Sequence, residues 1–507
     1  MAAAPAVSDD RGPLPPPSSR TDCLSRSVVF ALLLPLLLRE VLPALPLGTL
    51  PGSVLAAFSP STPTRTAAAD ASAAAQLPVW TDDLLYAPGF ADGLERRHRL
   101  AGAGGAADRG YALATAELQA LIRRTQFPPE GGCAPGVGRF LVSHGQGYAG
   151  TGYGALIQIA AMHLGLAVGL NRTFLWHDVV NGEYSDVETC GELFGINCFV
   201  RAPSSCTLAD ALDPGADTVH VTGSDAPVRS FGLPIGYVPP EALRILGSAP
   251  GAMGDTPAES SDGPSIAKYL WRAQCAAFLA LLNDKTLADL RTLRLLSSNN
   301  SLASVTSRSG SGISSVETPP DSDPAVAFFR SINPELRSYS LRALPPAPTF
   351  PLRRGTISMH IRHGDKGTEM KLVPTLNYLE AASALQNSMA LELVQQGFVS
   401  TEDPSALSEL NDALSAKPAT HGRWVLHYSN LPRINSNGHQ QLDVFTSVPR
   451  ARLTQLWLLQ LLMALECDAW VGTRRSNWNR MIDEFRCIWV PKCSMPYVEV
   501  GDADLGI

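Results

Sequence analysis

Residues 355–369 read Gly-Thr-Ile-Ser-Met-His-Ile-Arg-His-Gly-Asp-Lys-Gly-Thr-Glu, which predicts a strand that runs into a polar loop. Apolar and polar residues alternate from Ile357 onward, with the two-residue period of a strand. This period places His360 and Arg362 on the same side. Because open α/β sheets bind ligands at the carboxyl ends of their strands, the stretch indicates an α/β fold and the place of a site.

Six side chains that ionise or donate hydrogen bonds gather at this strand end: His360, Arg362, His363, Asp365, Lys366 and Glu369. The Arg362 guanidinium stays charged and can give two hydrogen bonds to one phosphate, so we expect a pyrophosphate ligand. Asp365 would hold Arg362 or accept a bond from a sugar or base, Lys366 would add charge, and Glu369 is the candidate base. A solvated turn with incidental ion pairs is the alternative. It is less favoured because the charges follow an apolar strand and adjoin turn glycines.

The segment His360–Glu369 resembles the donor motif of the α1,6-fucosyltransferases, in which His-x-Arg-Arg-x-Asp-Lys is followed by Gly-Thr-Glu. Protein O-fucosyltransferases share only the shorter His-x-Arg-x-Gly-Asp portion, so Lys366 and Gly-Thr-Glu favour the first family. The chain departs from the motif at two points. His363 stands where the family has a second Arg, and one residue is missing between Lys366 and Gly367.

The resemblance implies a GT-B-like α/β fold, with two Rossmann-like domains facing across a cleft. It implies an enzyme that transfers fucose from GDP-fucose to a glycan hydroxyl, with inversion and without a metal ion or cofactor. The catalytic residues would be Glu369, Arg362, Lys366 and Asp365, and the donor-binding residues would be His360, Arg362, His363, Gly152, Tyr153, Gly154, Thr473 and Ser476. Glu369 would remove the acceptor proton, while Arg362 and the helix start at Ser476 would bind the pyrophosphate. The partners would be GDP-fucose and a glycan or glycoprotein acceptor.

The length of 507 residues predicts more than one domain. We expect a leader and low-complexity stalk over 1–79, an N-terminal α/β domain on the acceptor side over 80–296, a disordered loop and linker over 297–344, and a C-terminal nucleotide-sugar-binding domain over 345–507. The net charge of −7 argues against a nucleic-acid partner.

The apolar run Ser27–Leu38 follows Arg20 and Arg26 and is typical of a signal sequence. It is shorter than the ~20 residues of a spanning helix. A cleaved signal or a type II membrane anchor is expected, with an organellar transit peptide as the alternative. The predicted location is the Golgi lumen, or otherwise outside the cell.

Of nine cysteines, Cys23 lies in the leader, which leaves eight. An even number favours disulfides in an oxidising compartment, although the pairing cannot be deduced and buried thiols are the alternative. No Cys-x-x-Cys pair occurs, so no zinc site is expected.

Gly145–Gly150 has the pattern Gly-x-Gly-x-x-Gly, between a predicted strand over 139–143 and a predicted helix over 155–165. This context also suits an NAD(P)-dependent oxidoreductase. Against that alternative, Gly152 and Gly154 extend the loop, and Asp178 lies farther away than the usual ~20 residues. The Gly152–Gly154 stretch, with Asn171–Leu175, resembles the glycine-rich helix start and following strand of the fucosyltransferases.

A second polar constellation, Val471–Arg480, follows a predicted strand over 469–472. Ser476 is expected to cap a helix through Glu484 and to point N–H groups at an anion, although ordinary helix capping is a competing interpretation. Thr473 and Ser476 match the Thr-x-Ser-Ser stretch of the family. Gln460 stands where the family places an Asp that contacts the base.

Further helices are predicted over 111–125, 266–282, 375–394 and 452–465, strands over 173–176 and 424–427, a polar insertion over 402–420, and disordered loops over 247–264 and 297–324. Besides the oxidoreductase, two functional alternatives remain: another nucleotide-sugar transferase, including one like the protein O-fucosyltransferases, and a non-catalytic lectin-like relative.

Overall fold

The computed structural model describes residues 82–103, 109–144, 151–177, 184–193, 195–222, 231, 233, 237–247, 263–298, 350–389, 395–416, 424–429 and 449–501. The chain divides into two compact units, Met1–Ala75 and Gln76–Ile507. Every described residue belongs to the second unit. The predicted signal run Ser27–Leu38 lies outside the described residues.

A first parallel sheet has the strand order β2 (Thr173–His177), β1 (Arg139–His144), β3 (Asp217–Val221). Helix α4 (Tyr153–Gly169) packs on β1 and β2, and the short α6 (Leu208–Leu212) packs on β1 and β3. β1, β2 and α4 confirm the predicted elements. β3 was not predicted: most of its residues are at least partly exposed, and the alternation of Val219 and Val221 with Thr218 and His220 is short.

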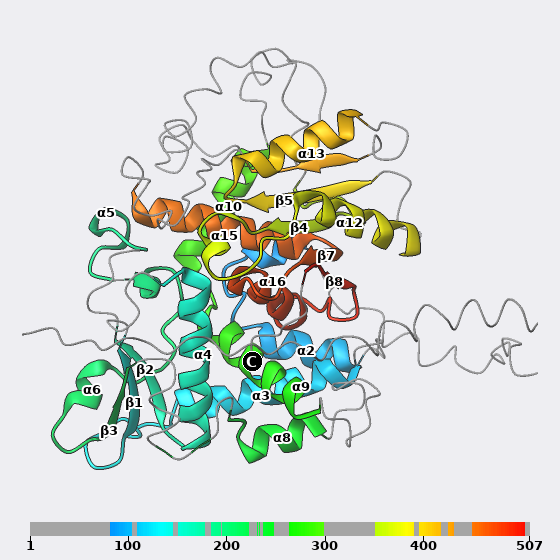
Figure 1. The fold of residues 1–507 in the computed structure, drawn as a ribbon. Coiled ribbons are helices and arrows are strands. Elements are labelled where there is room, and N and C mark those ends of the chain that lie inside the picture. The colour runs from blue at the N-terminus through cyan, green and yellow to red at the C-terminus, as the bar shows by residue number, and fades with distance from the viewer. Residues whose placement is uncertain are drawn as a thin grey trace, which may run out of the picture. The chain divides into compact units, whose positions relative to one another are not determined.

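A second parallel sheet has the order β6 (Val425–His427), β5 (Gln396–Thr401), β4 (Ile357–Ile361), β7 (Ala469–Gly472), β8 (Tyr497–Glu499). β4 is the central strand and is buried along its whole length. Its Ile357, Met359 and Ile361 join one apolar cluster with α12 (Thr375–Met389) and α13 (Pro404–Ala416). The predicted alternation is therefore confirmed, and Figure 1 shows β4 between β5 and β7. His360 is not part of this cluster, and its ring lies 6.4 Å from the ring of Trp478 on α16, centroid to centroid.

The prediction of a polar insertion over 402–420 is wrong for residues 404–416, which form α13. Ala406 and Leu410 lie four residues apart and are both buried, so this helix packs through a narrow apolar stripe. The polar residues interspersed along the segment concealed that spacing. The adjacent strand β5 and the last strand β8 were also not predicted.

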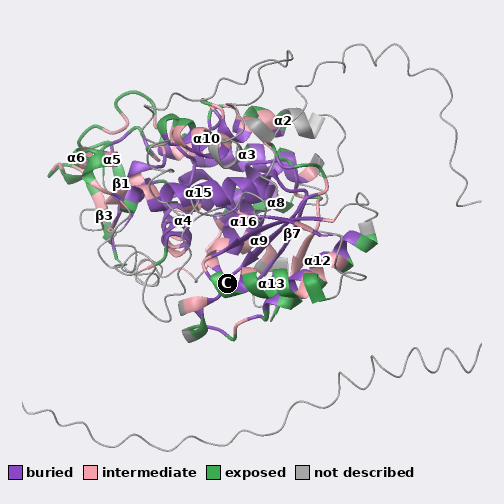
Figure 2. Cartoon of the chain, turned by 90° about the horizontal axis from the view of Figure 1, so that it is seen from above, coloured by how far each residue is buried: buried purple, intermediate pink, exposed green. Residues whose placement is uncertain are grey.

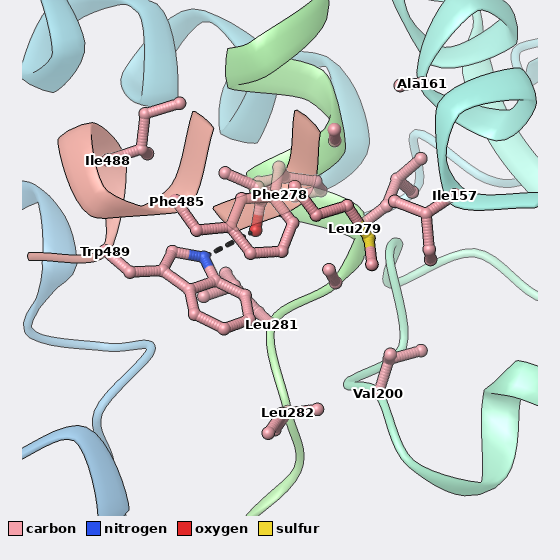
Figure 3. Close-up of a cluster of buried hydrophobic side chains, with 14 of the residues drawn as sticks. Ile157, Ala161, Val200, Phe278, Leu279, Leu281, Leu282, Phe485, Ile488 and Trp489 are labelled. Atoms are coloured by element: carbon pink, nitrogen blue, oxygen red, sulfur yellow. Dashed lines mark hydrogen bonds between the residues drawn. The ribbon is translucent and has the colours of Figure 1, made fainter. Parts of the chain in front are cut away.

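Helices α4, α9 (Gly263–Leu279), α15 (Arg450–Glu466) and α16 (Asn477–Ile488) pack around a shared apolar cluster. Figure 2 shows α15 and α16 buried, whereas α13 exposes residues along its length. In Figure 3, Ile157, Phe278 and Phe485 meet here, and the Trp489 indole N–H donates to the Ala277 carbonyl oxygen over 3.0 Å. Residues from both predicted domains thus contribute to one core.

The remaining elements are η3 (Asp82–Tyr86), α2 (Leu94–Ala103), α3 (Arg109–Gln126), α5 (Val187–Cys190), η5 (Gly195–Cys198), α8 (Pro240–Gly247), α10 (Asp284–Ser298) and η7 (Gly364–Thr368). α3, α9, α12 and α15 confirm predicted helices, and β6 and β7 confirm predicted strands. Residues 299–344 of the predicted linker and 248–262 of the predicted loop lie outside the described residues. The division into two domains stays a prediction.

Three disulfides join Cys133 to Cys206, Cys190 to Cys198, and Cys487 to Cys493. Cys275 and Cys467 are buried thiols. Of the eight cysteines outside the leader, six therefore form disulfides and two are buried thiols, so both alternatives stated from the sequence occur. Across the described part of the chain, no helix has both the length and the apolar character to cross a membrane.

Candidate functional site

The candidate site lies where the carboxyl end of β4 meets the first turns of α4 and α16. A Cβ placed on Gly154 of α4 would lie 3.2 Å from the carbonyl carbon of Asn477, so the two helix starts are in close contact. Asn479 Nδ2 donates to the His360 carbonyl oxygen over 3.1 Å, which ties α16 to β4. The stretches around residues 152, 360 and 476, identified separately in the sequence, are thus joined by direct contacts.

His360 provides a buried and neutral imidazole at this junction. Its Nδ1 lies 2.8 Å from Ser400 Oγ, whereas its Nε2 has no hydrogen-bond partner among the described residues. Burial, together with the charge of Arg362, lowers the pKa of His360 to about 3. The ring is therefore uncharged at neutral pH and acts as a hydrogen-bonding group rather than as a cation.

Tyr153 opens α4 and carries the second unpartnered group. Its side chain is buried, and its hydroxyl has no partner within the described part of the chain. Burial raises the pKa of Tyr153, which keeps the hydroxyl protonated. The indole ring of Trp478 lies 6.4 Å from the Tyr153 ring and 6.4 Å from the His360 ring, centroid to centroid. Since an unsatisfied buried polar atom is costly, Tyr153 and His360 mark a place where a ligand would supply the missing bonds.

The starts of α4 and α16 add backbone donors to the junction, because the first N–H groups of a helix have no partner within it. Gly152 and Ser476 occupy the two N-cap positions with extended backbone angles. The prediction that Ser476 caps α16 is right in position, but its side chain makes no capping hydrogen bond. Ser476 is nevertheless buried.

Arg362 is held by a residue that the sequence did not single out. Its Nη1 donates to Glu402 Oε1 over 2.5 Å, and the same oxygen accepts the His363 backbone N–H over 2.7 Å. Asp365, the predicted holder, lies in η7, and its side chain is outside the described part. Glu402 directly follows β5, so recognition of that strand in the sequence would have pointed to it.

Both ring nitrogens of His363 lie within hydrogen-bond distance of oxygen atoms of the protein. Its Nδ1 lies 2.9 Å from Asp403 Oδ2, and its Nε2 lies 2.9 Å from the Val373 carbonyl oxygen. The ring is also buried. This geometry suits a brace for the loop after β4, and direct contact with a donor stays a prediction.

Lys366 and Glu369 form an ion pair in which the lysine side chain is largely buried and the glutamate side chain is exposed. Lys366 Nζ contacts Glu369 Oε2, and their side chains are 11 % and 61 % exposed. Gly364, with φ +62°, permits the turn that brings the pair together. Glu369 is therefore the one of the two that a solvent-borne hydroxyl would reach.

The turn between β7 and α16 is stiffened by Arg474. Its Nε donates to Asp483 Oδ2 over 2.7 Å, and its Nη1 donates to Glu499 Oε2 over 3.2 Å. Thr473, which directly follows β7, is buried, and so is Gln460 in α15. Gly145–Gly150 and Asp178, on which the NAD(P) alternative depends, lie outside the described residues.

No protein-family model matches the chain, and a search of curated proteins finds no match either.

Proposed function

We propose that this chain is a GT-B-like fucosyltransferase, which takes fucose from GDP-fucose and transfers it to a hydroxyl of a glycan or glycoprotein. The observation that carries the proposal is the convergence of two helix N-termini on the buried groups Tyr153 and His360. Each of these has a polar atom without a partner in the described part of the chain. The choice of fucose and guanine rests on the resemblance of His360–Glu369 to the α1,6-fucosyltransferase motif. A protein O-fucosyltransferase-like activity is the alternative.

The charge balance of the site suits a pyrophosphate. Each helix N-terminus carries roughly half a positive charge, and α4 and α16 present two of them at one place. Arg362 and Lys366 are cations at the end of β4, each paired with a carboxylate: Arg362 with Glu402 and Lys366 with Glu369. The neutral His360 and Tyr153 would complete the ligand's hydrogen bonds without adding charge.

The reaction would proceed by direct displacement. The acceptor oxygen forms a bond to the anomeric carbon of fucose while the bond from that carbon to the phosphate oxygen breaks, which inverts the configuration. Glu369 takes the proton of the acceptor hydroxyl, and GDP leaves with the electron pair. Arg362, Lys366 and the helix starts stabilise the charge that develops on the departing phosphate, while Asp365 keeps its predicted role in the catalytic loop.

In this proposal, residues 345–507 hold the nucleotide sugar and residues 80–296 form the acceptor side. The disulfides are consistent with folding in an oxidising compartment, and we propose the Golgi lumen. The N-terminal apolar run would direct the chain there, as a signal or as an anchor.

The test is thermal unfolding of the full chain with GDP, GDP-fucose, GDP-mannose, UDP and NADPH in parallel. A ligand that binds only the folded state raises the melting temperature. We expect stabilisation by GDP and GDP-fucose, and its loss in Arg362→Ala. Arg354→Ala is the matched control, because Arg354 lies before β4 and pairs with Asp468 away from the site. Stabilisation by NADPH alone would refute the proposal and favour the oxidoreductase alternative.

A further inference from the structure

A buried hydrogen bond joins the two helices whose first turns form the candidate site. Gln158 Nε2 of α4 donates to Glu484 Oε2 of α16 over 2.6 Å. The Glu484 side chain is fully buried, and Gln158 is nearly so. Gln158 follows Tyr153 by little more than one helical turn, so the bond lies close to the start of α4.

Both members of the pair carry an acceptor without a partner. Gln158 Oε1 and Glu484 Oε1 are buried and make no hydrogen bond to any described residue. Arg272 on α9 forms an ion pair with Glu484: its Nε lies 3.9 Å from Glu484 Oε1, which is beyond hydrogen-bond reach. Two acceptors cannot satisfy each other, but a protonated carboxyl group is a donor as well as an acceptor.

The surroundings of Glu484 permit that proton near neutral pH. Burial raises the pKa of Glu484 to about 7, against the lowering effects of Arg272, the Gln158 bond and Arg480, while Asp483 raises it further. The other ionisable groups that sense Glu484 are Tyr269 and Cys275 on α9 and Tyr111 on α3. Burial raises the pKa of each of these three groups, so they stay neutral in the same range.

We propose that Gln158 and Glu484 form a pH-dependent latch between α4 and α16, in which protonated Glu484 donates to Gln158 Oε1 and accepts from Gln158 Nε2. With both bonds made, the first turns of the two helices are fixed for ligand binding. Ionisation releases the proton to solvent and removes one of the two bonds, so the helix starts loosen. Gln158 and Glu484 are positioning residues, and their effect on transfer rests on the proposed function.

The latch is tested on the full chain by amide hydrogen exchange at about pH 6 and about pH 8, corrected for the pH dependence of intrinsic exchange. In the unmodified protein, we expect protection in α4 and α16 to fall about tenfold at the higher pH. Glu484→Gln should remain protected at both, because its amide supplies a donor and an acceptor without titrating. Gln158→Leu should be less protected at both.

Gln119→Leu is the matched control, since Gln119 Nε2 donates to Gln274 Oε1 over 2.9 Å in another buried pair, between α3 and α9. This variant should keep the pH-dependent difference in α4 and α16. Protection that does not change with pH in the unmodified protein would overturn the latch. So would a pH-dependent loss in Glu484→Gln equal to that of the unmodified protein. Should Gln158→Leu fail to fold, Glu484→Gln alone decides.

GDP affinity measured on the same samples separates this inference from the proposed function. Exchange that behaves as expected without any GDP binding supports the latch and refutes the fucosyltransferase. GDP binding with pH-independent exchange supports the function and overturns the latch. When both hold, the GDP affinity of the unmodified protein should weaken between the two pH values, whereas that of Glu484→Gln should stay constant.

Discussion

Gly154 and Asn477 lie so close that any side chain at Gly154 would crowd the start of α16. A Cβ on Gly154 would be 3.2 Å from the carbonyl carbon of Asn477 and 3.3 Å from its carbonyl oxygen. These are backbone atoms at the start of α16, so they cannot rotate away as the end of a long side chain could. The absence of a side chain at Gly154 therefore sets the separation of the two helix starts.

Gly154→Ala should push α4 and α16 apart by a few tenths of an ångström. We expect the free energy of unfolding to fall by about 1–2 kcal/mol, because overpacking outweighs the gain of up to about 1 kcal/mol from alanine's helix propensity. Urea unfolding measures this change, and GDP titration should show weaker binding. Gly152→Ala is the control, because nothing lies within 4 Å of a Cβ there. Equal stability of the two variants would contradict the prediction.

Glu369→Gln should lower the rate of fucose transfer at least about 100-fold, since general bases typically contribute that much. GDP affinity should remain nearly unchanged, because Glu369 is exposed and pairs only with Lys366 in the described structure. Arg362→Ala should weaken both transfer and GDP binding. The measurements are initial rates with GDP-fucose and a panel of glycans, and calorimetric GDP titration. Full transfer by Glu369→Gln would exclude it as the base.

The stability of the chain should depend on pH through Glu484. Its pKa in the folded state, about 7, lies above the ordinary 4.5, so the folded state favours the protonated form. This contribution is fully present below about pH 4.5 and is lost as the pH rises through about 7, with a total of about 3 kcal/mol.

Glu484→Gln removes this titration. The free energy of unfolding of the variant minus that of the unmodified protein should therefore rise by about 3 kcal/mol between about pH 4.5 and about pH 8. Urea unfolding of both proteins at several pH values gives the difference, and the other titrating groups cancel in it. A difference that stays constant with pH would show that folding does not shift the pKa of Glu484 and would contradict the prediction.

The disulfides should contribute unequally. Cys133 and Cys206 are 73 residues apart, whereas Cys190 and Cys198 are 8 apart. By the chain-entropy estimate, the first cross-link stabilises by about 4 kcal/mol and the second by about 2.5 kcal/mol. Replacing each pair by serine and measuring urea unfolding should therefore show a larger loss for Cys133 and Cys206. Equal losses would contradict the entropic account for this chain.

Local pattern predicted the elements that carry the site. Strand alternation identified β4 with His360 on one face, and the glycine and hydroxyl residues after β7 identified the start of α16. The same patterns could not show that Gly154 meets Asn477, because that contact depends on how helices from distant parts of the chain pack.

Glu402 was missed for a different reason. Polar residues are interspersed along the segment after β5, and they obscured the four-residue spacing of Ala406 and Leu410 that indicates a helix. Once that helix is placed, Glu402 stands at a strand end beside Arg362. The disulfide pairs were beyond prediction, because eight cysteines allow 105 complete pairings and two of them remain thiols.

The Trp478 ring lies 6.4 Å from the rings of both Tyr153 and His360, centroid to centroid. Each of those two rings carries a polar atom that has no partner among the described residues. An indole is a fluorophore whose emission responds to nearby charge and to solvent. A phosphate bound beside these rings, as proposed, would bring negative charge close to the Trp478 indole. The chain thus contains its own optical probe of occupancy, and subtracting the emission of Trp478→Phe isolates that signal without any attached label.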